Sequence, residues 1–242
     1  MIARSLREHR FRIAVSRGER GCCNEAAKTL SEETKAALML SAISITELDD
    51  ELTERWHADT CDADDGSHDD WLNLVARQHR ANFELWHIED EARAPGATEA
   101  ELADVKRRVD STNQRRNDLA EQLDRVLLDW LQARKLPHPD APLHSESPGL
   151  IIDRLSILAL KIYHTREETD RENAPEGHGE RNRDRLVTLT EQRDDLANCL
   201  DSLWRETLEG KRRFKLYRQL KMYNDPSLNP AVYRKLVKEQ ER

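Results

Sequence analysis

The chain contains one strongly apolar helical stretch, PGLIIDRLSILALKIYH, at residues 148–164. At 100° per residue its aliphatic side chains gather on one broad face. The residues of this face are Ile151, Ile152, Leu155, Leu158, Ala159 and Ile162, and Ile157 and Leu160 widen it. A helix that is apolar around most of its surface is buried by its neighbours. We therefore expect a helix over about 149–172 that is the most buried element of the fold.

The composition places this helix in an all-α protein. Of the 242 residues, 36% are charged and 5% are aromatic, with only 8 Gly and 8 Pro. Sandwiches, barrels and Rossmann sheets use more Gly and Pro in their turns. No apolar run approaches the roughly 18 to 20 residues of a membrane span. The Arg-rich start lacks the apolar stretch of a signal peptide, so the expected location is cytoplasmic. The four cysteines have no metal-ligand spacing and are expected to be free thiols.

Further helices are predicted on both sides of the apolar one. Two of them begin with capping boxes, Thr46-x-x-Asp49 and Thr98-x-x-Glu101. The predicted helices cover about 45–57, 71–93, 99–134, 149–172 and 180–209, followed by a basic helix at 211–223 and a short helix from Pro230. A loop with four prolines at 135–149 is the longest interior connection.

The first 38 residues lack sustained apolar periodicity. We expect residues 1–38 to be a loosely attached extension, and Met39 is an alternative start. The remainder, 39–242, is expected to form one helical domain. It would contain a hairpin at 71–134, a second hairpin at 149–209 and a basic C-terminal segment at 210–242.

An internal repeat relates the two hairpins. A shift of 77 positions between residues 77–127 and their counterparts gives ten identities in 51 pairs, among them His87/His164 and Asp124/Asp201. Chance matching of charged, Leu-rich helices produces some such identities, but six of them fall within nine positions. We therefore predict a four-helix bundle built from two duplicated helical hairpins around a pseudo-twofold axis.

Polar side chains lie inside or beside the apolar faces at helical spacing. Gln78, Asn82 and Glu89 fall within the apolar arc of helix 71–93 and need an explanation. Four polar stripes, one on each hairpin helix, run as follows: Ala76, His79, Phe83, His87 and Asp90; Asn113, Asn117, Glu121 and Asp124; Asp153, Ser156, Leu160, His164 and Glu167; Thr190, Asp194, Asn198 and Asp201.

The stripes predict a divalent-metal site. Its candidate ligands are His87, Asp90, Glu121, Asp124, His164, Glu167 and Asp201. Carboxylates suit Mg or Mn, and added imidazole suits Zn, Fe or Mn. Glu84-x-x-His87 has the spacing of ferritin-like di-metal sites, but the repeat counterpart of Glu84 is Lys161. A better fit is Glu121-x-x-Asp124 facing His87-x-x-Asp90.

This pattern of paired acids on adjacent helices resembles the pattern found in the all-α nucleotide pyrophosphatases of the MazG and dUTPase kind. That resemblance implies acids that bind Mg, with the metal activating water against a phosphoanhydride. The sequence departs from the pattern at His87, where the pattern has an acid.

The alternative interpretation of the stripes is structural. Acids near Arg116, Arg154 and Arg193 would form buried ion pairs that set helix register. On this interpretation His87 and His164 donate to neighbouring carboxylates. Asp118 and Asp195 are expected in solvent, and Trp86 and Tyr163 in the core.

The C-terminal stretch GKRRFKLYRQLKMYNDPSLNP, at 210–230, is basic. Its candidate anion-binding residues are Lys211, Arg212, Arg213, Lys215, Arg218 and Lys221. Alternatively, this basic face docks on the acidic body of the protein. Its aromatics are too few and too periodic for a stacking platform, which argues against a nucleic-acid partner.

Four strings carry a family resemblance: NFELWHIEDEAR (82–93), NQRRNDLAEQLD (113–124), PGLIIDRLSILALKIYH (148–164) and YRQLKMYNDPSLNP (217–230). From Met39 onward the chain resembles a bacterial family known only as a domain of unknown function. Members are often encoded beside glycosyltransferases of surface-polysaccharide loci, which implies a role in that setting. The resemblance supplies no catalytic residues.

Two functions follow from these observations. One is a metal-dependent binder or hydrolase of nucleotides or phosphorylated sugars. The other is a non-catalytic helical partner of a glycosyltransferase. The first needs the stripes to converge on a cavity that solvent can reach, and the second needs them paired and closed.

Overall fold

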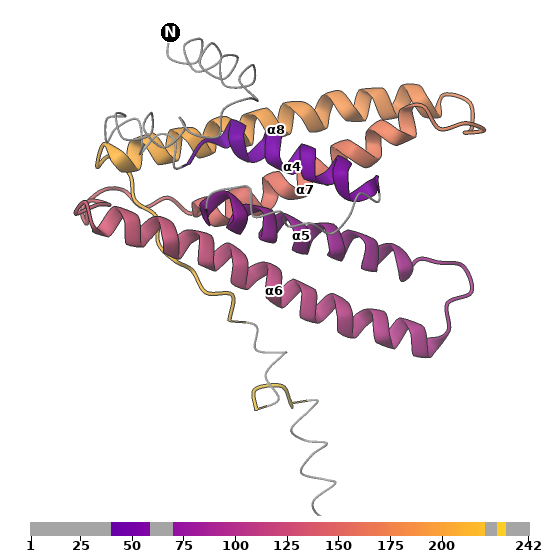
Figure 1. Cartoon of the computed structure of the whole chain (residues 1–242), viewed down its shortest axis with the longest axis horizontal. Helices are drawn as coiled ribbons and strands as arrows, with labels where there is room; N and C mark the ends of the chain where they lie inside the picture. Colours follow the sequence, from indigo (N-terminus) through magenta and orange to yellow (C-terminus); the bar gives the residue numbers. More distant parts are fainter. Residues whose placement is uncertain (1–39, 59–69, 221–226, 231–242) are drawn as a thin grey trace, which may run out of the picture. The chain divides into compact units, whose positions relative to one another are not determined.

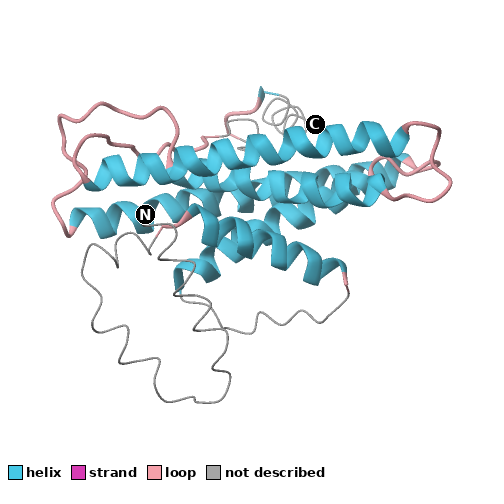
Figure 2. Ribbon diagram, turned by 90° about the horizontal axis from the view of Figure 1, so that it is seen from above, coloured by secondary structure: helices cyan, strands magenta, loops and turns pink. Residues whose placement is uncertain are grey.

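The structure, a computed structural model, describes residues 40–58, 70–220 and 227–230. Its helices are α4 (Ala42–His57), α5 (Asp70–Glu91), α6 (Glu99–Gln132), α7 (Pro148–Thr169) and α8 (His178–Leu208) (Figure 1). Two compact units are distinguished, residues 1–40 and 41–242, and all five helices belong to the second. The described residues contain no strand (Figure 2), and none of their helices combines the length and apolarity needed to cross a membrane. The predicted all-α class is confirmed.

Several predictions fall on residues that the structure does not describe. These are the extension at 1–38, the start at Met39, Cys22, Cys23, Cys61, Lys221 and the helix after Pro230. Of the four cysteines, Cys199 is described, and it is free and exposed.

The four long helices form the two predicted hairpins. α5 packs against α6, and α7 packs against α8. α4 lies on α5, α7 and α8 (Figure 1). α7 packs against each of the other four helices, and Ile152 and Leu155 in its apolar face are fully buried. The expectation that this helix is the most deeply packed is confirmed.

Residues separated by the repeat shift of 77 meet between α5 and α7. The side chain of His79 is hydrogen-bonded to Ser156, and the rings of His87 and His164 are neighbours. Two helices related by an axis that runs along them bring equivalent residues together in this way. The contacts are therefore those expected of a duplicated hairpin with a pseudo-twofold axis.

One capping box forms and the other does not. Thr98 and Glu101 form the predicted box at the start of α6, with Thr98 N donating to Glu101 Oε2 at 2.7 Å. α4 begins at Ala42, a turn earlier than predicted, and the hydroxyl of Thr46 donates to the carbonyl of Ile43. The earlier start has a tertiary cause, because Ala42 N donates to the Asp201 carboxylate of α8 at 2.9 Å.

The basic helix predicted at 211–223 is wrong for the residues described, 211–220, which have no helix. Gly210, at φ +71°, ends α8. The chain then pairs with the loop before α7, where His144 N donates to Arg213 O and Arg213 N donates to Pro142 O. Phe214 is 2% exposed. This pairing and the burial of one aromatic ring outweigh the helical pattern of the segment.

Candidate metal centre

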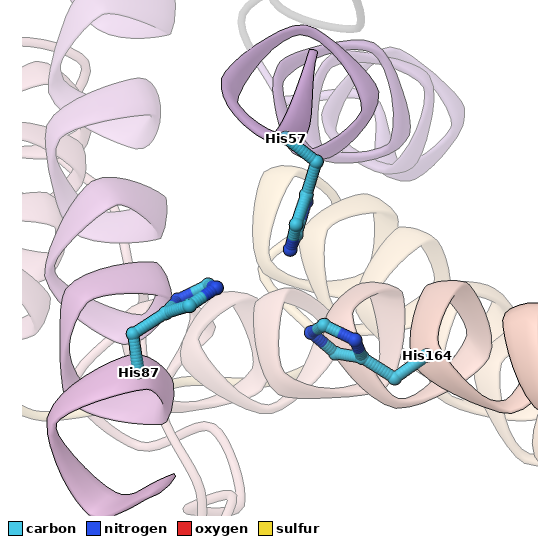
Figure 3. A group of neighbouring side chains, drawn as sticks. All are labelled: His57, His87 and His164. Carbon is cyan, nitrogen blue, oxygen red and sulfur yellow. The ribbon is translucent and has the colours of Figure 1, made fainter. Parts of the chain in front are cut away.

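Three histidines from three helices converge in the bundle. His57 is the last residue of α4, His87 lies in α5 and His164 lies in α7, and their rings point into one shared space (Figure 3). One ring nitrogen of each lies within 4.8 Å of those of the other two. The ring centroids are 5.2 Å apart for His57 and His87, 5.0 Å for His57 and His164, and 6.0 Å for His87 and His164.

Each imidazole is held through its Nδ1 atom. His57 Nδ1 lies 2.8 Å from Thr53 O, and His87 Nδ1 lies 2.8 Å from Phe83 O. His164 Nδ1 lies 2.9 Å from Glu167 Oε2. A carbonyl or carboxylate oxygen only accepts, so these contacts put the hydrogen on Nδ1 and leave Nε2 with its lone pair. Metal-binding histidines are oriented by outer partners of this kind.

The remaining ring nitrogens of two of these histidines are shielded from water. Nε2 of His57 and Nε2 of His164 are buried with no hydrogen-bond partner among the described residues. Burial lowers the pKa of His57, the Thr53 hydrogen bond opposes this, and His164 and His87 lower it further. Neutral imidazole is the form that binds metal. The lowered pKa of His57 therefore favours the form of its imidazole that binds a cation.

The spacing of the rings fits one ion. With Zn–N bonds of 2.0 to 2.1 Å, tetrahedral geometry puts imidazole centroids roughly 5 Å apart and their nitrogens about 3.3 Å apart. The observed centroid distances of 5.0 to 6.0 Å agree with this, and the nitrogens need a closure of at most about 1.5 Å. Three side chains could thus share an ion through small rotations.

Aromatic side chains frame the cluster. The ring of Trp86 stacks on His164 with centroids 4.8 Å apart, and Tyr163 stacks on His57 at 4.2 Å. Phe83 contacts the rings of both His57 and His87. Trp86 and Tyr163 were expected in the core, but both are only half-buried. They form walls of the histidine cluster instead.

An open cavity of about 360 Å³ lies beside the cluster, between α5 and α6. Among its lining residues are Phe83, Glu84, His87, Glu91, Arg108 and Thr112. Arg108 donates to both carboxylate oxygens of Glu91, and Glu84 accepts from Arg115. Of the three histidines, His87 lines the cavity, so solvent approaches the cluster from that side.

The predicted ligands separate into two groups. His87 and His164 meet, and Glu167 holds the His164 ring. The remaining four lie elsewhere: Asp90 is exposed near Arg93, Glu121 accepts from Gln219 N, Asp124 accepts from Ser147 and Gly149, and Asp201 accepts from Ala42 N.

The predicted facing of Glu121-x-x-Asp124 and His87-x-x-Asp90 is not observed. The cavity beside His87 reaches Thr112, and Asp124 lies twelve residues further along α6. At 1.5 Å per residue this is about 18 Å. Helical phase predicts which face of a helix a residue occupies. It does not predict which residues of the two helices lie at the same level along the hairpin, and the pairing of α5 with α6 determines this.

The structural interpretation applies to the stripe acid Asp153. Arg116 donates to both of its carboxylate oxygens, at 2.7 and 2.6 Å. Gln78 and Asn82 donate to the same carboxylate, which explains two of the polar residues in the apolar arc of α5. Arg193 pairs with Asp50 and Arg154 with Glu146, but both of these pairs are partly exposed. Asp153 is thus a closed junction of α5, α6 and α7.

Three of the predicted anion-binding cations have partners within the chain. Lys211 pairs with Glu209 at 2.7 Å and Arg212 with Glu206 at 2.9 Å. Arg213 Nε donates to the carbonyl of Ala141 at 2.7 Å. Lys215 and Arg218 lie further along the same segment, where the chain has no helix. The described part of this segment is therefore not helical, and three of its cations are engaged by other groups of the chain.

His57 was missed from the sequence. It lies in α4, outside the duplicated hairpins, so the repeat gives it no counterpart. Two signals in the sequence could have found it: Glu54-x-x-His57 repeats the spacing of Glu84-x-x-His87, and Trp56–His57 stands at the end of a predicted helix. The docking of α4 on α5 and α7 brings it to the other two histidines.

The chain matches no curated protein and no solved structure. One family profile, described as "Protein of unknown function (DUF4254)", matches residues 72–216, which is more than half of the chain. His87 and His164 lie inside the matched range and His57 lies before it. The chain therefore belongs to the DUF4254 family of proteins of unknown function.

Proposed function

We propose that His57, His87 and His164 hold a zinc-class divalent ion, and that the protein uses it to bind or hydrolyse phosphorylated ligands. The observation that carries the proposal is the set of three imidazoles whose Nδ1 atoms are all engaged and whose rings converge, with one nitrogen of each within 4.8 Å of the others. Imidazole donors favour Zn, Cu, Fe and Ni, whereas Mg prefers oxygen. The expectation of Mg or Mn depended on carboxylates that do not join this cluster.

The proposed chemistry follows from the number of ligands. Three protein ligands leave a fourth position for water or substrate, as in catalytic rather than structural zinc sites. A zinc-class ion there would lower the pKa of bound water to about 7 and polarise a phosphoryl oxygen. His87 lines the open cavity, which supports an approach from that side.

Arg108 supports a phosphorylated ligand. Its guanidinium group gives two of its five N–H donors to Glu91, so Glu91 fixes its orientation and leaves donors for a ligand. Arginine is well suited to phosphate because its planar donors match the phosphate oxygens. The setting of surface-polysaccharide metabolism, implied by the family resemblance, is consistent with phosphorylated sugars or nucleotides as ligands.

The metal test measures Co²⁺ and Zn²⁺ binding to the full chain. We expect one ion per chain, with a cobalt absorption spectrum typical of nitrogen ligands. Replacing His57, His87 or His164 by Gln should weaken binding by more than roughly 100-fold, beyond the effect of losing an outer partner. His138→Gln, in an exposed position outside the cluster, is the control. Equal binding by all four variants, or no binding by the wild type, would refute the proposal.

The ligand test uses Arg108→Gln in the zinc-loaded protein. We expect it to weaken binding of inorganic phosphate and slow hydrolysis of p-nitrophenyl phosphate by roughly tenfold or more, because a charge-assisted hydrogen bond contributes about 1.5 to 3 kcal/mol. Metal affinity should not change. Arg107→Gln is the matched control, since Arg107 is exposed, pairs with Asp104 and does not line the cavity. Identical behaviour of the two variants would count against phosphate recognition at Arg108.

The second candidate function is that of a non-catalytic helical partner of a glycosyltransferase. The closed Asp153–Arg116 junction favours it, because a scaffold needs its polar stripes paired. It predicts that the three His→Gln variants keep partner binding and that the zinc-loaded protein hydrolyses no phosphate ester. The metal and ligand tests above separate the two candidates.

A further inference from the structure

A fourth histidine, His79, is fully buried on α5, about two helical turns before His87. It belongs to α5 and makes hydrogen bonds to both neighbouring helices. Its Nε2 lies 2.8 Å from Thr53 Oγ1 of α4, and its Nδ1 lies 2.7 Å from Ser156 Oγ of α7. Its ring stacks on Trp56, with centroids 5.2 Å apart.

The hydrogen positions in this contact follow from its partners. The Thr53 hydroxyl donates to the carbonyl of Asp49 at 2.7 Å, so it can only accept from His79, whose hydrogen must lie on Nε2. The Ser156 oxygen accepts from Asn82 Nδ2 at 2.9 Å and gives its own hydrogen to His79 Nδ1. The chain of donors therefore runs in one direction, from Asn82 to the Asp49 carbonyl. His79 has the opposite tautomer to His57 and His87.

The surroundings keep His79 neutral. Burial lowers the pKa of His79 to about 3. The Asp49 carboxyl, 3.7 Å from His79 Nδ1, is itself buried, and its pKa is raised well above the usual value. Burial thus disfavours the charged form of both groups, and the neutral His79 ring keeps one donor and one acceptor for its two hydrogen bonds.

His79 is connected to the proposed metal centre by its contacts with the end of α4. Thr53 supplies the carbonyl that accepts from His57 Nδ1, and Trp56 immediately precedes His57. α4 ends at His57, so no further turn of α4 follows to hold this one. Its attachment to the bundle includes the His79 contacts with the Thr53 hydroxyl and the Trp56 ring.

We infer that His79 is a positioning residue of the metal centre, which holds the final turn of α4 through its Nε2–H bond to Thr53 and so aims the His57 imidazole at the shared space. The inference rests on the proposed metal function. His79 itself binds no metal, because its two nitrogens are occupied.

The test compares two amides at position 79. His79→Gln places an amide NH₂ near the position of Nε2 and keeps the donation to Thr53. His79→Asn reaches only the position of Nδ1, so it keeps the Ser156 contact and loses Thr53. Both variants lose the ring that stacks on Trp56, and a purely structural role predicts similar effects of the two.

We expect His79→Gln to bind Co²⁺ close to the wild-type affinity and with the wild-type absorption spectrum. His79→Asn should bind roughly 10- to 100-fold more weakly, the usual cost of losing an outer partner, with a shifted spectrum. Equal affinities and spectra for the two variants would overturn the inference while leaving the metal centre in place. A wild type that binds no Co²⁺ would instead refute the proposed function.

A second pair covers the case that His79→Asn does not fold. Thr53→Ser keeps the hydroxyl that accepts from His79 and should retain affinity, whereas the isosteric Thr53→Val should lose it to the same extent as His79→Asn. Side-chain nitrogen NMR of the wild type needs no variant at all. It should show hydrogen on Nε2 of His79 and on Nδ1 of His57, and the opposite tautomer at His79 would exclude the bond to Thr53.

Discussion

Two buried aspartates of this fold, Asp153 and Asp49, differ in their hydrogen-bond partners and in the form of the carboxyl group that their surroundings favour. Asp153 is 7% exposed, and its carboxylate is held by Arg116, Gln78 and Asn82. Asp49 is 0% exposed, and neither of its carboxylate oxygens has a hydrogen-bond partner among the described residues. Burial raises the pKa of Asp49, with a further rise from Asp50 that Arg193 partly opposes. The first is a charged junction, and the second favours the protonated form.

Asp49→Asn should therefore stabilise the protein at neutral and alkaline pH. Because the folded pKa of Asp49 lies above its unfolded value near 3.8, folding binds a proton, and this contribution is complete below the unfolded pKa and declines as pH rises through the folded pKa. Asparagine has no such titration. Urea denaturation at pH 4 and pH 8 should show a higher free energy of unfolding for the variant at pH 8, with the gain shrinking toward pH 4.

Asp153→Asn is the matched control for this prediction. The same chemical change breaks the pair with Arg116, so it should lower the free energy of unfolding by roughly 3 kcal/mol at pH 8. Losses of equal size from both substitutions would show that Asp49 has a charged partner.

At the scale of elements, helix starts depend on neighbouring helices. The Asp124 carboxylate of α6 accepts from Gly149 N at 2.7 Å and from the Ser147 hydroxyl, at the start of α7. Asp201 of α8 accepts from Ala42 N at the start of α4. The two aspartates occupy equivalent positions of the repeat, and each caps a helix that is not its own. Burial raises the pKa of Asp124 to about 6, although its hydrogen bonds oppose the rise.

Gly149→Ala should destabilise the junction of α6 and α7. A Cβ at this position would lie 2.3 Å from the carbonyl oxygen of Ala120 and 2.9 Å from Asp124 Oδ1. The obstacle is backbone, so the two helices must move apart, at a cost of roughly 1 to 3 kcal/mol by comparison with overpacked cores.

Thermal or urea unfolding of the Gly149→Ala variant measures this cost. Cobalt binding is a useful second measurement, because the histidine cluster lies far along the bundle from Gly149 and should keep its affinity in the folded variant. An unfolding free energy equal to that of the wild type would mean that α7 does not approach α6 as closely as 2.3 Å implies.

At the scale of the whole molecule, the described helices form the second compact unit, residues 41–242. The proposed ligands His57, His87 and His164 all belong to this unit. Its core brings together buried side chains from α4, such as Ile45 and Leu52, and from the two hairpins, such as Leu123 and Leu200. The unit therefore contains both a core and the candidate site.

Deletion of residues 1–38 is expected to leave the stability and metal binding of the remainder nearly unchanged. The sequence of this segment has no periodic apolar face with which to add to a core. Thermal unfolding and Co²⁺ titration of a chain that begins at Met39 test this expectation. A loss above roughly 2 kcal/mol, the scale of one buried aliphatic side chain, would show that the segment packs on the protein.

Short-range signals in the sequence were enough to predict the five observed helices and the pairing of the four long ones, although they also predicted a basic helix that does not form at 211–220. The 3.6-residue period marked α5 to α8, the Thr98–Glu101 box marked the start of α6, and Gly210 marked the end of α8. The apolar surface of α7 predicted its central position, and the repeat predicted two hairpins. These features depend on residues a few positions apart, or on identity between copies, so they can be read without coordinates.

The tertiary structure alone decided which side chains meet. The sequence placed His87 and Asp124 on inward faces, but the pairing of α5 with α6 separates them by many residues along the bundle. The repeat in the sequence did not connect His57 with the duplicated hairpins. The docking of α4 on α5 and α7 brings His57 to His87 and His164. The sequence predicted a helix at 211–223, but in the described part, 211–220, the burial of Phe214 and the pairing with residues 142–144 accompany a chain without helix. The physical reason is the same in each case. Helical phase sets the direction of a side chain around its own axis, whereas convergence depends on the axial register and crossing of different helices, which packing of the whole core determines.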